Sequence, residues 1–421
     1  MTLLFLILAL LSAWATYNLY FPVYKHSKGV VISFLSGWLV GELVWHHLVF
    51  QVVLTLVFVA AGVVDGVFGS IGLLMLLVSW WGMTMYHLQA DLAENEIERS
   101  LENGLGADYR THIRADAVYD DVKPLSKKQL ARPFSTMRSD QVESIKNIPY
   151  EQVDGLNLKL DIRRPKIKPE NAPVLFQIHG GAWTHKMGSK NEQAIPLMNR
   201  LAENGWVCVA ISYRLSPKAT FPEHIIDCKK ALVWVKKHIA EYGGNPNFIL
   251  VTGGSAGGHL SSLLSLTENY APFQPGFEDE NTEVQGCIPF YGIYDFHDEK
   301  ALQYHKGLEQ ILQTSILKVS KQDNPELYRQ ASPVNHAHKQ APPFMVVQGD
   351  KDTLVSTDEA RYFVESLKQI SDSPVVYAEI SGAQHAFDVF PTVRSEHVLN
   401  GVVRFAGWLY SDYLNKSKAL N

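Results

Sequence analysis

Cysteine is scarce in this sequence of 421 residues, which contains only Cys208, Cys228 and Cys287. Three scattered cysteines are too few for a disulfide framework, and their spacing is not that of a zinc site. Cys208 and Cys287 lie in apolar runs typical of strands. We therefore expect buried free thiols, which favours a reducing compartment.

Positive charge is limited as well. The net charge is -5, the pI is near 6.3, and no lysine or arginine occurs between Lys28 and Arg99. A partner rich in phosphate needs a clustered basic face, so nucleic acid is excluded as a partner. No set of histidines and acidic residues has the spacing of metal ligands, and we expect no metal and no cofactor.

Residues 1–90 are almost entirely apolar, whereas the remainder resembles a soluble protein. The run 2–20 has no basic start and is followed by more apolar sequence, so it predicts a retained membrane helix instead of a signal peptide. The run 30–64 is too long for one perpendicular span, which predicts a spanning helix at 48–64 after an interfacial or re-entrant piece. Residues 67–88 form a further span. We predict a multi-pass transmembrane helical region over 1–90, with membrane lipids as partners.

The orientation in the membrane follows from two lysines. Lys25 and Lys28 favour a cytoplasmic location for the 21–29 loop. With three spans, the C-terminal domain is then cytoplasmic, but a crossing within 30–46 would reverse this. The alternative, a set of buried soluble helices, disagrees with the length of the apolar runs.

The chain beyond residue 90 has two parts. Residues 91–145 are charged and are expected to form a linker and cap helices. Residues 146–417 alternate short apolar runs with amphipathic helices, which predicts the α/β class with a mostly parallel sheet covered on both faces. The runs expected to be strands are 174–178, 207–212, 248–252, 287–290, 344–347 and 375–380.

The most specific motif is Gly-Gly-Ser-Ala-Gly at 253–257. It follows an expected strand directly and opens an expected helix, which is the setting of a nucleophile elbow. Glycines two before and two after Ser255 remove side chains that would clash in the tight turn. A phosphate-binding loop is the competing interpretation, but no Lys-Ser or Lys-Thr pair follows. Ser255 is the predicted nucleophile.

A second glycine-rich loop, His-Gly-Gly-Ala-Trp at 179–183, follows another expected strand. The backbone N–H groups of Gly180 and Gly181, with that of Ala256, would form an oxyanion hole. His179 is expected to hold the loop and not to act as a base. Trp183 is either a wall of the substrate pocket or a packing residue; we assign it to substrate binding.

A serine nucleophile needs a base and an orienting carboxylate, which in this setting follow in the order Ser, Asp or Glu, His. Asp350 and Asp352 follow the expected strand 344–347, and His385 follows 375–380. Asp352 is assigned as the orienting carboxylate and His385 as the base. Asp350 is expected to bond to local backbone.

Residues 146–417 therefore resemble the hormone-sensitive-lipase and carboxylesterase branch of the α/β hydrolases. The resemblance rests on His179-Gly180-Gly181, Tyr213-Arg214-Leu215, Phe221-Pro222 with Asp227, the 253–260 run, Asp352 and His385-Ala386-Phe387. It implies a cofactor-free serine esterase with a small helical cap, here expected from about 105–140 and 295–335.

Two positions depart from that branch. Ala182 stands where a third glycine is common, and Gly254 stands where aspartate is common. The Gly-Gly-x-Trp form also resembles kynurenine-formamidase-like enzymes and feruloyl or acetyl esterases. The expected function is carboxylesterase or lipase-like hydrolysis of a small-molecule or lipid ester. The alternatives are an amidase or formamidase using the same triad, and a membrane scaffold with an inactive hydrolase fold.

Overall fold

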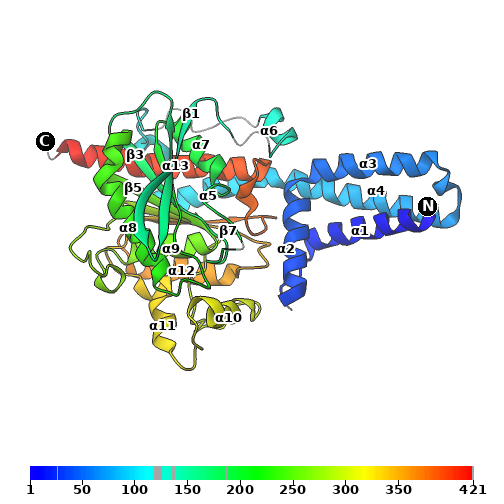
Figure 1. Ribbon diagram of the computed structural model, residues 1–421. Coiled ribbons are helices and arrows are strands. Elements are labelled where there is room, and N and C mark those ends of the chain that lie inside the picture. The colour runs from blue at the N-terminus through cyan, green and yellow to red at the C-terminus, as the bar shows by residue number, and fades with distance from the viewer. Residues whose placement is uncertain (26, 118–125, 135–137, 186, 420–421) are drawn as a thin grey trace.

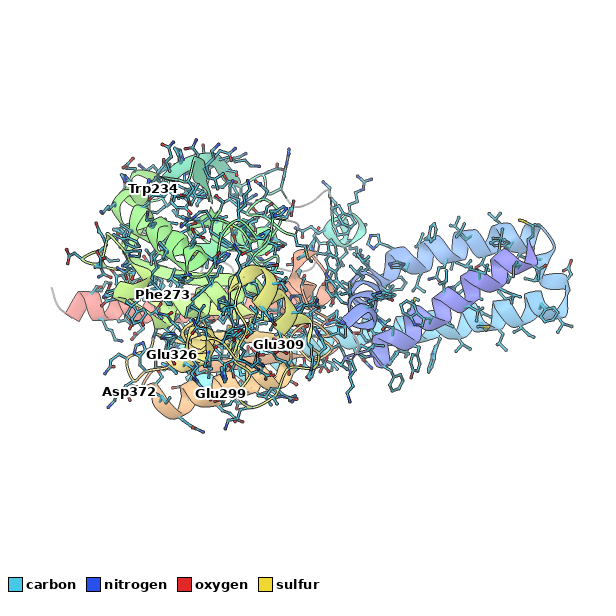
Figure 2. The ribbon with its side chains drawn as sticks, turned by 60° about the horizontal axis from the view of Figure 1, so that its bottom comes forward. Trp234, Phe273, Glu299, Glu309, Glu326 and Asp372 are labelled. Carbon is cyan, nitrogen blue, oxygen red and sulfur yellow. The ribbon has the colours of Figure 1, made fainter. Side chains whose placement is uncertain are left out.

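The computed structural model describes residues 1–421 except 26, 118–125, 135–137, 186 and 420–421. Two parts are evident in Figure 1: a globular part around a twisted sheet, and an arm of long helices that projects from it. Figure 2, a second view, shows side chains filling the globular part and the helices of the arm extending from it.

The globular part contains one sheet of eight strands in the order β1-β2-β4-β3-β5-β6-β7-β8. β1 and β2 form an antiparallel hairpin, β2 pairs antiparallel with β4, and all later neighbours are parallel. This confirms the expected α/β-hydrolase architecture. The strands are β1 (Val142–Val153), β2 (Leu156–Pro165), β3 (Ala172–Ile178), β4 (Val207–Ile211), β5 (Gly244–Gly254), β6 (Gly286–Phe290), β7 (Phe344–Gly349) and β8 (Val375–Ile380).

Helices cover both faces because side chains of a strand alternate between them. In β3, Leu175 belongs to one apolar cluster while Val174 and Phe176 belong to the other. The first cluster includes residues of α5 (Leu92–Leu105), α7 (Ile195–Glu203) and α13 (Val393–Ala419); the second includes residues of α8 (Glu223–His238) and α9 (Ala256–Leu266). α12 (Thr357–Ile370) packs beside β7 and β8 in a third cluster.

The segment expected to form a linker and cap helices begins with a helix that packs in the core. α4 (Val67–Leu88), η2 (Gln89–Asp91) and α5 form one continuous helix of 39 residues. Ile97 and Leu101 of α5 are fully buried. The helix approaches β8 so closely that a Cβ at Gly104 would lie 2.6 Å from Val376 Cγ2. The expected cap at 105–140 lies partly outside the described residues, and its described pieces are η3 (Tyr109–His112) and α6 (Lys127–Ala131).

The arm consists of α1 (Thr2–Tyr20), α2 (Ser27–Glu42), α3 (Val44–Ala60), η1 (Val63–Asp65) and α4. Among the described residues, two helices are long and apolar enough to cross a membrane, or three if α2 and α3 are taken as one bent pair. The bend between α2 and α3 is 89°. A change of direction before the second apolar helix was expected, but the bend comes at Leu43, a few residues earlier than predicted from the sequence.

Small residues let the helices of the arm approach one another. A Cβ at Gly82 of α4 would lie 2.7 Å from Thr16 of α1. Gln51 of α3 accepts hydrogen bonds from Ser12 Oγ at 2.7 Å and from Trp80 Nε1 at 2.9 Å. Small residues and buried polar pairs between helices are typical of membrane bundles. Large apolar side chains are exposed on the outside, including Leu4, Leu10, Phe50, Leu56, Phe68, Leu74 and Trp81.

The connection from β6 to β7 forms a lobe beside the sheet. Its elements are α10 (Gly307–Ile311), the π-helical turn η6 (Leu312–Ile316), α11 (Pro325–Gln330) and η7 (Pro333–His336). Figure 2 labels Glu299, Glu309 and Glu326 on this lobe. The remaining short turns are η4 (Ile239–Tyr242), η5 (Ala271–Phe273) and η8 (Phe387–Val389).

Candidate active site

Ser255 occupies the sharp turn between β5 and α9. Its backbone has φ 57° and ψ -120°, which is a strained conformation for a residue with a side chain. Its N–H donates to the carbonyl of Phe290 at 3.0 Å, tying the turn to the end of β6. Ser255 is half-buried and stands at the N-terminus of α9, where backbone N–H groups have no partner within the helix. The turn therefore has the geometry expected of a nucleophile elbow.

Two glycines allow the turn to form. A Cβ at Gly257 would lie 2.1 Å from the carbonyl oxygen of Ile178, and one at Gly253 would lie 2.4 Å from that of Gly257. Gly254, which stands where related enzymes often carry aspartate, faces the ring of Tyr291. A Cβ there would lie 2.7 Å from the tyrosine hydroxyl. Tyr291 thus takes the space that a side chain at 254 would need.

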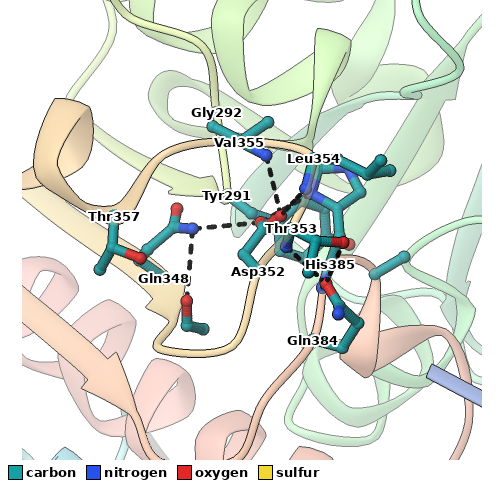
Figure 3. Close-up of polar contacts among 12 residues, drawn as sticks. Tyr291, Gly292, Gln348, Asp352, Thr353, Leu354, Val355, Thr357, Gln384 and His385 are labelled. Carbon is teal, nitrogen blue, oxygen red and sulfur yellow. Dashed lines mark hydrogen bonds and ion pairs between the residues drawn. The ribbon is translucent and has the colours of Figure 1, made fainter. Parts of the chain in front are cut away.

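His385 and Asp352 lie together on adjacent loops after β8 and β7. Nδ1 of His385 is 2.7 Å from Oδ2 of Asp352, and both side chains are buried. Oδ1 of Asp352 accepts from the N–H groups of Leu354 and Val355, each at 2.9 Å, and Oδ2 also accepts from Gln348 Nε2 at 3.1 Å (Figure 3). These bonds hold the carboxylate toward one imidazole nitrogen, as an orienting group requires.

Asp350, the competing carboxylate, is engaged elsewhere. Its Oδ1 accepts from the N–H of Gly382 at 2.7 Å. Burial raises the pKa of Asp350, while nearby Lys351 acts in the opposite direction. Asp350 thus bonds to backbone, but that backbone belongs to the β8 loop, whereas its own turn was expected.

Gln384 links the two loops that carry Asp352 and His385. Its Oε1 accepts from the N–H of Thr353 at 2.8 Å and from the N–H of His385 at 2.9 Å (Figure 3). The side chain is buried. One amide oxygen therefore fixes the separation of the two loops. Its position next to His385 was the only signal for it in the sequence.

The loop after β3 lies against the nucleophile turn, because β3 and β5 are neighbours and Ile178 pairs with Gly253. The ring of His179 stacks on Tyr213 at 4.5 Å, and its Nδ1 is 2.7 Å from the carbonyl oxygen of Gly180. Burial lowers the pKa of His179 to about 4. This neutral, enclosed histidine holds the loop and is not placed to act as a base.

The N–H of Gly180 is engaged in a hydrogen bond within the protein. It donates to Oε1 of Gln193 at 2.5 Å, which differs from the expectation that it points at the substrate. Gly181 has φ 112° and its Cβ position would lie 1.5 Å from Met187 O, so only glycine fits there. In this conformation, the expected oxyanion donors that remain are the N–H groups of Gly181 and Ala256.

Trp183 is buried among core side chains, with 2% of its surface exposed. Its Nε1 donates to Nδ1 of His259 at 3.2 Å, and its ring meets the rings of His259 and Phe296 edge to face. Burial lowers the pKa of His259 to about 3, consistent with a neutral acceptor. These contacts are those of a packing residue.

Two further residues adjoin the histidine and were missed in the sequence. Tyr291 lies 4.5 Å from His385 ring to ring, and its hydroxyl donates to Asp388. Asp388 is buried, which raises its pKa, while the bond from Tyr291 acts to lower it. Since Tyr291 also contacts Gly254, it connects the nucleophile turn with the histidine loop. Its place directly after strand 286–290 was the available signal.

Known esterases resemble this chain in sequence. The family model described as BD-FAE matches residues 160–367. The probable carboxylic ester hydrolase LipM of Mycobacterium tuberculosis (strain ATCC 25618 / H37Rv) is 41% identical over 412 residues, covering 96% of this chain and 93% of LipM. The esterase LipQ of the same strain is 44% identical over 274 residues, covering 65% of this chain and 64% of LipQ.

Solved structures support the fold alone. A truncated carbohydrate esterase from gut microbiota superposes with a TM-score of 0.53 at 20% identity, covering 64% of this chain and 98% of that one. The match to LipM, in contrast, includes the arm as well as the globular part. The chain therefore belongs to the family of α/β-hydrolase carboxylic ester hydrolases that includes LipM.

Proposed function

We propose that this esterase cleaves carboxylic esters through an acyl-enzyme formed on Ser255. The observation that carries the proposal is the buried His385–Asp352 contact of 2.7 Å, which Tyr291 connects to the strained turn of Ser255. In the first step, Ser255 Oγ attacks the ester carbonyl while His385 takes its proton. Asp352 fixes the imidazole tautomer and stabilises the imidazolium.

The developing negative charge would be held by backbone donors. Ala256, which directly follows the serine, and Gly181 would supply N–H groups, and Gly180 would join them only after Gln193 releases it. His385 then gives its proton to the leaving alcohol, and the alcohol departs. A water molecule, deprotonated by His385, attacks the acyl-enzyme carbonyl. His385 returns that proton to Ser255 Oγ as the bond to the serine breaks, which releases the carboxylic acid and the free serine.

We also propose that α1, α3 and α4 cross a membrane. The support is their exposed apolar surface, the length of the helices that contain α1 and α4, and the polar contacts kept between the helices. In Figure 1 these three helices run side by side, and α2 runs across their end next to the globular part. Lys25 and Lys28 then lie on the same side as the catalytic domain, which favours the cytoplasmic side. Release of the full chain from membranes by alkaline carbonate would contradict this.

The catalytic proposal is tested with Ser255→Ala in the full chain. Hydrolysis of p-nitrophenyl butyrate and labelling by a fluorophosphonate should both fall to background. Ser262→Ala is the matched control, because the hydroxyl of Ser262 donates to Gly258 O within its own helix α9, at 2.8 Å. Retained activity in Ser255→Ala would refute the nucleophile. A matched anilide distinguishes the amidase alternative, since an esterase should turn it over far more slowly than the ester.

A further inference from the structure

Helix α2 of the arm packs directly on the two loops that carry Asp352 and His385. We propose that α2 is part of the catalytic site and that Trp38 is a positioning residue for His385. The proposal rests on the proposed function, because it assigns a role in the chemistry of Ser255. It means that the N-terminal region does more than attach the enzyme to a membrane.

The contact that carries this proposal is made by an indole. Nε1 of Trp38 donates to the carbonyl oxygen of Ala386 at 2.8 Å. Ala386 directly follows His385 and has φ 61°, a left-handed conformation that is strained for alanine. A hydrogen bond to this peptide group favours the one backbone conformation that presents the imidazole to Asp352. Trp38 therefore acts through the backbone, without touching the reacting atoms.

Aromatic rings extend the same contact to the imidazole itself. Phe34, one turn before Trp38, meets the ring of His385 edge to face at 6.0 Å. Phe34 stacks on Trp38 at 5.6 Å, and Trp38 stacks on Phe390 at 5.0 Å. Residues 34 and 38 lie on one side of a helix. That side of α2 thus covers His385 and two residues that follow it, Ala386 and Phe390.

The same helix also reaches the acid loop and the link between the loops. Thr353 Oγ1 donates to the carbonyl oxygen of Val30 at 3.4 Å. A Cβ at Gly37 would lie 3.3 Å from Nε2 of Gln384, the residue that connects both loops. α2 is therefore in contact with the loop that carries Asp352, with the loop that carries His385, and with Gln384, which links the two loops.

Polar contacts fasten the end of α2 and the neighbouring α4 to the catalytic domain. Glu42, the last residue of α2, is paired with Arg394 and accepts from Thr392 Oγ1 at 2.8 Å. Tyr86 of α4 donates to the carbonyl oxygen of Gly382, in the loop that leads to His385, at 2.5 Å. These buried bonds hold α2 in place over the site.

The opposite side of α2 remains uncovered. Val31, Ile32, Leu35 and Leu39 are exposed there and are apolar. The contacts to the catalytic loops thus come from a helix with one enclosed side and one open side. A change in the position of α2 would be transmitted to the Ala386 peptide through Trp38.

The test uses Trp38→Phe in the full chain, in detergent micelles. Phenylalanine keeps an aromatic ring for stacking but lacks the N–H. We expect kcat for p-nitrophenyl butyrate to fall about fivefold, as loss of one net hydrogen bond would produce, with KM changed less than twofold. The rate of fluorophosphonate labelling of Ser255 should fall by a similar factor.

Trp45→Phe is the matched control. The indole of Trp45, in the same arm, donates to Nε2 of His87 at 2.8 Å and does not contact the catalytic loops in the described structure. Its kcat should stay at the wild-type value. Equal kcat in Trp38→Phe and wild type, or an equal loss in both tryptophan variants, would overturn the proposal. Absence of labelling in the wild-type protein would instead refute the proposed function, and the inference with it.

Discussion

Glu42 and Arg394 form an ion pair across 352 residues of sequence, with 2.5 Å between Arg394 Nη1 and Glu42 Oε1. Their side chains are 2% and 1% exposed. Burial acts against the charge of Arg394, but Glu42 and Tyr86 outweigh it and raise the pKa of the guanidinium. The arm and the catalytic domain are therefore joined through a charged contact from which water is excluded.

Removal of one partner of this pair should be costly. Glu42→Leu leaves Arg394 charged and buried, and we expect a loss of about 3–5 kcal/mol in the free energy of unfolding. The double variant Glu42→Leu, Arg394→Met has no buried charge to satisfy and should recover much of that loss. Thermal unfolding in detergent measures both. If the loss of stability in the double variant equals the sum of the losses in the two single variants, the two charges do not interact.

The two aspartates of the β7 loop should respond differently to the same change. Asp352→Asn keeps the shape but offers the wrong partner to His385 Nδ1, and kcat should fall by about 10⁴. Asp350→Asn keeps an acceptor for the N–H of Gly382 and should retain kcat within a few fold. Steady-state hydrolysis of p-nitrophenyl butyrate compares them. A larger loss of kcat in Asp350→Asn than in Asp352→Asn would show that Asp350, and not Asp352, orients His385.

Glu359 should make stability depend on pH. Burial raises its pKa to about 8, and its Oε1 accepts from the N–H groups of Tyr294 at 2.6 Å and Asp295 at 2.9 Å. Between the ordinary value of 4.5 and about 8, the folded protein keeps a proton that the unfolded chain has lost. Stability therefore falls as pH rises through this window, by an amount on the order of a few kcal/mol.

Glu359→Gln isolates that contribution. Glutamine presents an oxygen to the same two N–H groups but does not titrate. Its midpoint of thermal unfolding should change less than that of the wild type between pH 5 and pH 8, and should be the higher of the two at pH 8. Parallel curves for the two proteins would show that Glu359 is ionised in the folded state.

Gly257 should tolerate no side chain. Its Cβ would lie 2.1 Å from the carbonyl oxygen of Ile178, whereas a Cβ at Gly66 meets nothing within 4 Å. Gly257→Ala should abolish fluorophosphonate labelling or prevent folding, and Gly66→Ala should leave both unchanged. Normal labelling of Gly257→Ala would mean that the turn can relax, against the close packing seen here.

Much of this site could be predicted because its residues occupy fixed places on a parallel sheet. Side chains that follow successive strands meet at one edge, so Ser255, Asp352 and His385 could be placed from strand ends alone. In the structure His385 contacts Asp352, whereas Asp350 accepts from the N–H of Gly382. The α/β architecture followed from the alternation of short apolar runs and amphipathic helices.

What could not be predicted depends on contacts between distant segments. Gln193 takes the N–H of Gly180 through a loop conformation that no local pattern indicates. The packing of Phe34 and Trp38 on the histidine loop joins residues about 350 positions apart. α5 falls in the segment expected to form a linker and cap helices. Its place in the core could not be predicted because its exposed acidic side dominates the composition, although Ile97 and Leu101 are buried.

The helix that runs without a break from Val67 to Leu105 has a mechanical consequence. Its first part, α4, lies in the arm, and its last part, α5, packs between β8 and α13. An enzyme attached by a flexible linker can tilt and can move over a range of distances from its anchor. A continuous helix shared by both parts instead fixes the height and the tilt of the catalytic domain. In the proposed membrane arrangement, such an enzyme reaches ester groups at a single depth, and selects among substrates by where they sit as well as by what they are.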